Sequence, residues 1–272
     1  PSDIRVSYQG PVPKEFFCVP MNTIAVYQEL LPKFCSSSNG FLRPSYLLYG
    51  PSQFGKTTLA LRLAEEIMRD PSVEVIFLCL NPSDVNSELT FWRAIGLWMK
   101  AKTFDSHDLI DVLNARNKRL CLILDEMDIM MERSGVARNL ISTICSWQTA
   151  QFFHGFLGIG SPKLLTLPNL FINGSIFLNS FSLMMMEPFT DQQMVDFFDQ
   201  IRVSYDFAPS IRRAIMDYSS GAPGVFGSLI RFSIDRRMWK CEFNEWYSLV
   251  KIHNFTPYLL YCNATYNYIG GT

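Results

Sequence analysis

Apolar and polar residues follow two patterns along the first part of the chain. Short, nearly continuous apolar runs are typical of strands buried on both faces, whereas apolar residues at every third or fourth position are typical of helices. The apolar runs predict strands over 46–49, 73–80, 120–124, 156–160 and 181–186. Helical spacing is present at 59–68, 87–102, 107–116 and 136–149. This alternation predicts an α/β fold with a five-stranded parallel sheet, covered by helices on both faces.

From Pro188 onward only helical patterns remain. Thr190 and Gln193 form a capping box at the start of the first of these segments. The predicted helices cover 191–201, 210–218 and 225–239. A Gly-Ala-Pro-Gly turn at 221–224 breaks the chain before the last of them. We expect these helices to form a small lid domain.

A phosphate-binding motif lies between the first predicted strand and the helix that follows it. The pattern Gly-x-x-x-x-Gly-Lys-Ser/Thr is matched by Gly50, Pro51, Ser52, Gln53, Phe54, Gly55, Lys56 and Thr57, followed by Thr58. The two glycines let backbone N–H groups crowd around phosphate oxygens, and the helix presents its positive end to them. We expect Lys56 to reach the outer phosphates of a nucleotide and Thr57 to bind magnesium. A chance match to a strand-turn-helix segment is the alternative.

The third predicted strand ends in the acidic pair Asp125 and Glu126. Because carboxyl ends of parallel strands lie at one edge of a sheet, we expect this pair beside the phosphate loop. Two carboxylates there have separate tasks. Asp125 is our metal residue, and Glu126 is our base for the water that attacks the terminal phosphate. Acidic residues also occur at helix N-termini without any catalytic role.

Polar residues near these strand ends add further candidates. Ser161 follows the fourth predicted strand, where many ATPases keep a polar residue that senses the terminal phosphate. An ordinary turn serine is an equal alternative, and Lys163 is a weaker candidate for the same role. For Asp128 we favour a place in the first turn of the next helix over a share in the chemistry.

Composition limits the classes of function. The chain has 272 residues, 48% of them hydrophobic, which is enough for a packed core. With Lys+Arg 24 against Asp+Glu 25, the charge balance does not indicate nucleic acid or an acidic membrane as a partner. The apolar runs are too short to cross a bilayer. Seven cysteines lack ligand spacing, and Cys79 and Cys121 fall in strands expected to be buried, so we interpret them as reduced core residues of an intracellular protein.

These motifs together resemble the AAA+ superfamily of P-loop ATPases. The phosphate loop, the Asp-Glu strand end, the polar end of the fourth strand and Gly221-Ala222-Pro223 occur in that family's order. The loop is similar to that of archaeal-type ATPases and of signal-transduction ATPases with numerous domains (STAND), including origin-recognition-like members. The resemblance covers Phe17 to Arg236. It implies that Pro223 packs the lid against the base and sugar of the nucleotide.

The chain departs from the family pattern in two places. The segment Phe17–Met21 lacks the Arg-Glu pair usual there, and the lid lacks a Gly-Ala-Arg sensor, with Arg231 only similar in position. Arg133 and Arg138 lie where an AAA+ subunit offers an arginine to a neighbouring copy, and a solvated helix face explains them equally well. The stretch Phe91–Gly96 is also similar to the ATPase domain of Crinkler-type effectors of fungi and oomycetes. That likeness would place the protein inside a host cell.

The chain begins at Pro1 rather than Met, so we expect a fragment of a longer protein with flanking domains. The expected segments are a P-loop nucleotide-binding core with an N-terminal leading segment over 1–187, a helical lid over 188–240 and an aromatic-rich C-terminal segment over 241–272. The last segment is either a strap across the core or the remnant of a further module.

ATP is expected rather than GTP, because no Asn-Lys-x-Asp element follows a late strand. The leading hypothesis is an ATPase that binds Mg-ATP and hydrolyses it to ADP and phosphate as a switch for flanking domains or self-association. Its catalytic residues would be Glu126, Lys56 and Ser161. One alternative is a nucleotide-binding module for interaction or dimerisation that hydrolyses slowly or not at all. Another is an origin-recognition-like ATPase associated with DNA.

Overall fold

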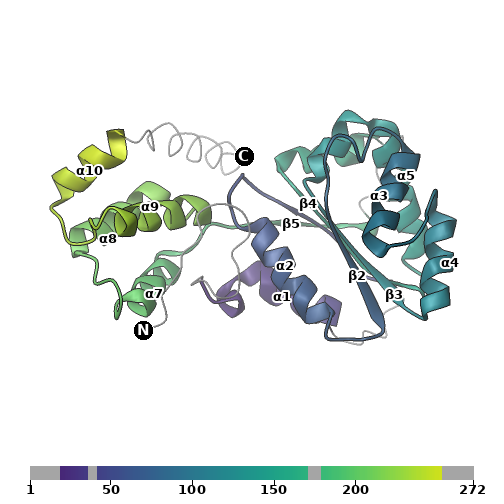
Figure 1. Ribbon diagram of the computed structural model, residues 1–272, viewed down its shortest axis with the longest axis horizontal. Helices are drawn as coiled ribbons and strands as arrows, with labels where there is room; N and C mark the ends of the chain where they lie inside the picture. The colour runs from purple at the N-terminus through teal and green to yellow at the C-terminus, as the bar shows by residue number, and fades with distance from the viewer. Residues whose placement is uncertain (1–18, 36–41, 171–178, 253–272) are drawn as a thin grey trace. The chain divides into compact units, whose positions relative to one another are not determined.

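The fold is known from a computed structural model that describes residues 19–35, 42–170 and 179–252. Its central element is one sheet of five parallel strands (Figure 1). The strands are β1 (Ser45–Tyr49), β2 (Val73–Cys79), β3 (Arg119–Asp125), β4 (Phe153–Gly160) and β5 (Ser182–Met185). They lie in the order β2-β3-β4-β1-β5. The predicted α/β fold is confirmed, and each expected strand is present.

Helices and short 3-10 helices connect these strands. The helices are α1 (Ala25–Cys35), α2 (Lys56–Ile67), α3 (Glu88–Met99), α4 (Ser106–Arg116) and α5 (Ser134–Trp147). The 3-10 helices are η1 (Met21–Thr23), η2 (Met127–Glu132) and η3 (Pro162–Leu170). The connections from one strand to the next run through helices, as parallel strands require.

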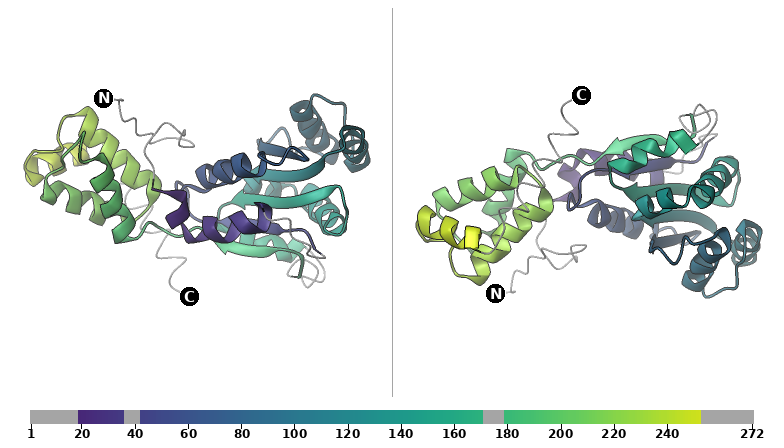
Figure 2. Two further views of the ribbon diagram at one scale, coloured as in Figure 1. Left: turned by 90° about the horizontal axis from the view of Figure 1, so that it is seen from below. Right: turned by 90° about the horizontal axis from the view of Figure 1, so that it is seen from above.

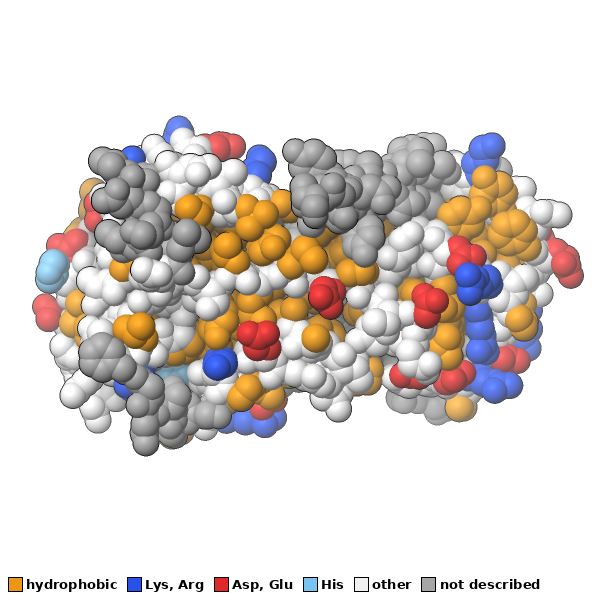
Figure 3. All heavy atoms as spheres, turned by 180° about the vertical axis from the view of Figure 1, so that it is seen from behind, with side chains coloured by type: hydrophobic (Ala, Val, Ile, Leu, Met, Phe, Trp, Pro, Cys, Tyr) orange, Lys and Arg blue, Asp and Glu red, His pale blue; other side chains and the backbone are white. Residues whose placement is uncertain are grey.

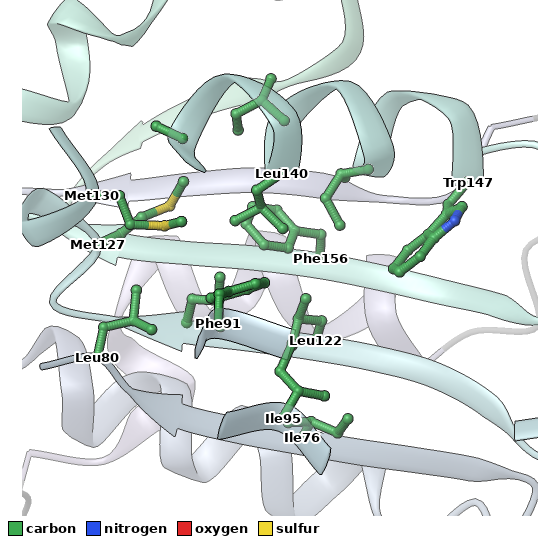
Figure 4. Packing of buried hydrophobic residues seen from close by; sticks show 14 of the residues in the cluster. Ile76, Leu80, Phe91, Ile95, Leu122, Met127, Met130, Leu140, Trp147 and Phe156 are labelled. Carbon is green, nitrogen blue, oxygen red and sulfur yellow. The ribbon is translucent and has the colours of Figure 1, made fainter. Parts of the chain in front are cut away.

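One face of the sheet packs against α3, α4 and α5. Side chains alternate between the two faces along each strand, so Leu122 and Phe156 point to this side, where they meet Phe91 and Leu140 (Figure 4). The neighbouring residue Gly155 faces the other side. A Cβ atom there would lie 2.8 Å from the ring of Phe34 in α1, so α1 covers the second face. Figure 2 gives two further views of this layered arrangement.

The C-terminal part of the described chain consists of helices. They are α7 (Asp191–Ile201), α8 (Pro209–Ser219), α9 (Pro223–Asp235) and α10 (Phe243–Ile252). The capping box of α7 forms as expected, because the Gln193 N–H donates to Thr190 Oγ1 at 3.2 Å and the Thr190 N–H donates to Gln193 Oε1 at 2.8 Å. Phe226 of α9 packs edge-on against Phe197 and Phe198 of α7, which gives these helices a core of their own.

Some details differ from the sequence-based expectations. The helix α10 was not predicted within the aromatic-rich segment. The helix predicted over 225–239 instead runs over Pro223–Asp235. Cys79, expected to be buried, is exposed, because β2 is an edge strand and Cys79 is its last residue. Cys121 is buried in β3, as expected.

The chain divides into two compact units. One comprises Ala25–Gly50 and Leu59–Met185 and therefore holds the sheet and most of the helices around it. The other comprises Pro1–Ile24, Pro51–Thr58 and Met186–Thr272. The phosphate loop thus belongs to the same compact unit as α7 to α10, although the strand before it belongs to the other.

Charges of both signs are mixed on the described part of one face. On the side of the molecule seen in Figure 3, Lys and Arg side chains lie among Asp and Glu side chains. This mixture agrees with a formal net charge of -1. Among the described helices, none combines the length and the apolar character needed to cross a membrane.

Candidate functional site

The candidate site residues belong to the carboxyl ends of three neighbouring strands. The strand β1 ends at Tyr49, β3 ends at Asp125 and β4, which lies between them, ends at Gly160. Because all three strands are parallel, these ends share one edge of the sheet. The phosphate loop leaves that edge after Gly50, and Ser161 follows β4 directly.

The phosphate loop is a tight turn between β1 and α2. Its backbone takes left-handed values at Gln53, with φ 64°, and at Gly55, with φ 79°. Glycine adopts this region without steric cost, which explains Gly55, whereas Gln53 is held there by its surroundings. The helix α2 begins at Lys56, so the loop ends at a helix N-terminus, where backbone N–H groups favour an anion.

The side chain of Lys56 folds back over this loop. Its Nζ donates a hydrogen bond to the Pro51 carbonyl oxygen at 2.7 Å. The ammonium group therefore lies at the loop itself, within reach of a phosphate bound there. Thr57 and Thr58 follow in the first turn of α2, and Thr58 is buried.

The acidic pair takes two different environments. Asp125 is only 3% exposed, and its Oδ1 accepts a hydrogen bond from the Glu126 N–H at 2.9 Å. Glu126 is exposed and has a left-handed backbone with φ 56°. The turn therefore directs one carboxylate into the protein and leaves the other open to solvent. Although Cys79 is exposed as a whole residue, partial burial of its thiol raises the pKa of that group, and the negative charges of Asp125 and Glu126 raise it further.

These residues are of the kind that a magnesium site requires. Magnesium prefers oxygen ligands and keeps several waters, so one or two protein oxygens beside the substrate phosphates are sufficient. The buried Asp125 carboxylate and the Thr57 hydroxyl supply such oxygens. The donor set therefore fits Mg-nucleotide.

Asp128 has a role that sequence reasoning did not assign. Its two carboxylate oxygens lie 2.9 and 2.8 Å from the Ser161 backbone nitrogen and accept its N–H. It lies in the first turn of η2, as expected, and it ties that turn to the end of β4. A Cβ atom on Gly160 would come within 2.6 Å of Asp128 Oδ1, so the contact needs a glycine there. The Ser161 hydroxyl accepts the Lys163 N–H at 3.2 Å, as in an ordinary serine turn.

The structure also places the other candidates. The turn Gly221-Ala222-Pro223 leads directly into α9, and Pro223 is the first residue of that helix. A Cβ atom built on Gly55 would lie 3.9 Å from Pro223 Cβ, so the turn lies against the phosphate loop.

Arg231 forms an ion pair with Asp235 at 2.9 Å on the same helix, α9. Arg133 and Arg138 are exposed near the start of α5. The segment Phe17–Met21 lies only partly within the described residues.

A hollow of about 430 Å³ lies at the opposite end of the sheet, where β3 and β4 begin. Two of its arginines are paired, Arg69 with Glu66 at 2.5 Å and Arg119 with Asp70 at 2.9 Å. The C-termini of α1 and α2 also end there, and the negative ends of these helices do not favour an anion. This hollow is therefore a poorer candidate for nucleotide phosphates than the loop.

Comparisons with known proteins concern the fold. The fold is that of AAA+ ATPase domains. Residues 46–153 match the model of the family described as "ATPase family associated with various cellular activities (AAA)". Comparison with curated protein sequences gives no significant match.

Several solved structures have a similar fold. The chain is similar to the ORC1 protein of Aeropyrum pernix in complex with DNA, with 16% identity, a TM-score of 0.57, and 84% of this chain and 63% of that chain covered. It is also similar to Cdc6p from Pyrobaculum aerophilum, with 15% identity, a TM-score of 0.59, and coverage of 84% and 65%. Domain III of Thermotoga maritima DnaA shares 13% identity with a TM-score of 0.52, and coverage is 87% and 93%. The chain spans less than two thirds of the first two proteins, and at these identities the likeness concerns the fold.

Proposed function

We propose that this chain binds Mg-ATP and hydrolyses it to ADP and phosphate, and that the cycle switches its conformation. The observation that carries the proposal is the shared sheet edge, from which the phosphate loop departs and at which buried Asp125 precedes exposed Glu126. The AAA match over residues 46–153 supports the same chemistry. The resemblance to STAND ATPases supports flanking domains or neighbouring copies of the chain as receivers of the switch.

Each residue has a defined part in the proposed reaction. The loop N–H groups and Lys56 would hold the β- and γ-phosphates, and Asp125 with Thr57 would hold magnesium, whose charge would neutralise that of the phosphates. Glu126 accepts a proton from water as the water oxygen bonds to the γ-phosphorus. The bond from that phosphorus to the bridging oxygen breaks, and its electron pair leaves on ADP. Ser161 lies at the neighbouring strand end, from which its hydroxyl would contact the γ-phosphate.

The first test is phosphate release from ATP and from GTP by the wild type and by Glu126→Gln. We expect the wild type to turn over ATP in a magnesium-dependent reaction. The variant should retain ATP binding and release phosphate about a hundredfold more slowly or worse, because its amide cannot act as the general base that takes the proton. Glu132→Gln, an exposed change in η2, is the matched control and should turn over normally. Equal turnover in Glu126→Gln would contradict the assigned base.

The second test concerns binding. Lys56→Ala should lose most of its affinity for a fluorescent ADP or ATP analogue, because a charge partner of the phosphates is removed. Lys102→Ala, an exposed lysine outside the site, should bind as the wild type does. Unchanged affinity in Lys56→Ala would contradict the loop assignment. Tight binding by the wild type with no turnover would instead favour a nucleotide-holding interaction module, and nucleotide-dependent DNA binding would favour the origin-recognition-like alternative.

A further inference from the structure

The first turn of α9 is hydrogen-bonded to the phosphate loop. The Gly224 N–H donates to the Gln53 carbonyl oxygen at 2.8 Å. Both residues belong to the same compact unit. Because Pro223 has no N–H, the Gly224 N–H is the first that α9 offers at its N-terminus, where such groups lack a partner within the helix. The helix therefore donates to the loop an N–H group that has no acceptor within α9 itself.

The contact leaves no room for a side chain at residue 224. A Cβ atom there would lie 2.5 Å from Gln53 Cβ, 2.6 Å from Gln53 Oε1 and 2.9 Å from the Gln53 carbonyl oxygen. Real Cβ atoms essentially never approach other heavy atoms this closely, so any larger residue has to push the loop and the helix apart. Gly224 is thus required by the close approach of two backbones.

The turn before α9 is itself held firmly. Gly221 has φ 75°, and a Cβ atom there would lie 2.3 Å from the Phe189 carbonyl oxygen. The Phe189 N–H donates to the Gly221 carbonyl oxygen at 2.7 Å. Backbone bonds of this kind fix where the α9 N-terminus begins. The turn that supports the loop is therefore itself tied to the backbone of Phe189.

On the loop side, the bond is accepted by Gln53, a non-glycine residue with a left-handed backbone. Gln53 is a non-glycine residue at φ 64°, and such a conformation persists only where neighbouring groups maintain it. Gln53 also lies within the run of loop residues whose N–H groups would surround phosphates. A change in its backbone would redirect those donors.

We propose that Gly224 is a positioning residue for nucleotide binding, which holds the phosphate loop in its binding shape through the backbone of Gln53. The coupling between α9 and the phosphate loop runs through two backbones and needs no charged side chain from the helices after residue 188. It rests on the proposed nucleotide binding at the loop, and it does not depend on hydrolysis.

The experiment compares two glycine substitutions by their Kd for a fluorescent ADP analogue. Gly224→Ala should weaken binding about tenfold or more, as expected when a preformed set of donors is displaced. Gly135→Ala is the matched control, because a Cβ atom at this helical glycine of α5 meets nothing within 4 Å. It should bind within about twofold of the wild type. Circular dichroism and thermal melting establish that both variants are folded.

A double substitution tests the route. Gln53→Gly keeps the carbonyl that accepts the bond and removes both side-chain atoms that would meet an alanine at 224. Adding Gln53→Gly to Gly224→Ala should therefore recover part of the lost affinity, so that the two effects are not additive. Strict additivity would contradict a route through Gln53.

Hydrogen exchange of the wild type provides a measurement without any variant. ADP should slow exchange in a peptide covering 221–226 more than in one covering α10, because the loop and the α9 N-terminus are ordered together. Normal ADP binding by folded Gly224→Ala, or no change in exchange at 221–226, would overturn the proposal. If the wild type bound no nucleotide, or if Lys56→Ala bound normally, the proposed function itself would fail.

Discussion

Single residues in this chain show how a candidate site depends on backbone contacts as well as on reactive side chains. Glu126 and Ser161 follow different strands, and Asp128 connects them, since it lies two residues after Glu126 and accepts the Ser161 N–H with both oxygens. The neighbouring Gly160 has no space for a side chain against that carboxylate. Asp128 therefore fixes the spacing of two strand ends that the proposed reaction uses.

Removal of this carboxylate should slow the reaction more than it weakens binding. We expect Asp128→Ala to lower the rate of phosphate release about tenfold with nucleotide Kd within about twofold, because a lost positioning contact acts on the transition state. Asp128→Asn keeps one acceptor oxygen and should restore most of the rate. Asp111→Asn on the exposed face of α4 is the control. An equal loss in the Asn and Ala variants would argue against a role for the hydrogen bond.

At the scale of elements, the local pattern predicts an element well where its burial is regular and poorly where tertiary contacts decide. The strand β3 was predicted within one residue at each end, because its interior is uniformly buried. The helix α10 was missed, since its aromatic residues follow no clear period in the sequence. Trp246 explains its presence, because the ring is fully buried and its Nε1–H donates to Ser233 Oγ of α9 at 2.8 Å. No local rule reports that contact.

This contact makes Trp246 an anchor of α10. We expect Trp246→Ala to lower the free energy of unfolding by about 3–5 kcal/mol, because a large buried ring and its hydrogen bond are lost. Trp98 in α3 is 42% exposed, so Trp98→Ala should lower the free energy of unfolding far less. Urea titration of both variants measures the difference. Similar losses in the two variants would show that α10 contributes little to the packing.

At the scale of the whole molecule, the topology predicts which strand ends meet but not the final shape of the site. Parallel strands place Asp125, Ser161 and the start of the phosphate loop at one sheet edge, and that much follows from the alternation of strands and helices. The bond between Gly224 and Gln53 does not follow from it, because it joins segments far apart in sequence through two main chains. A close main-chain contact is visible in a sequence only as the glycine that it requires. Because the sequence contains 15 glycines, the pattern does not single out Gly224.

A histidine at the opposite end of the sheet contributes a pH dependence to the stability of the fold. Burial lowers the pKa of His154, and its Nε2 lies 2.7 Å from the Phe34 carbonyl oxygen. A folded-state pKa below the unfolded value of about 6.5 means that the unfolded chain binds the proton more readily. The neutral imidazole therefore stabilises the fold above that pH, and this stability is lost as the pH falls below it.

We expect the free energy of unfolding, measured in urea, to fall between pH 7.5 and pH 5.5 in the wild type (a window set by the ordinary histidine pKa of about 6.5). His154→Gln should flatten this dependence. His107→Asn, at a side chain that is 89% exposed, should leave it unchanged. An unaltered slope in His154→Gln would assign the pH dependence to other groups.

The grouping of Pro51–Thr58 with the C-terminal helices also bears on engineering. A designer who transplants this sheet onto another protein, and stops after β5, would carry over every letter of the phosphate motif. The graft would lack Gly224, and on the present proposal its loop would lose the support that shapes it. A portable nucleotide module cut from this chain should therefore extend through α9.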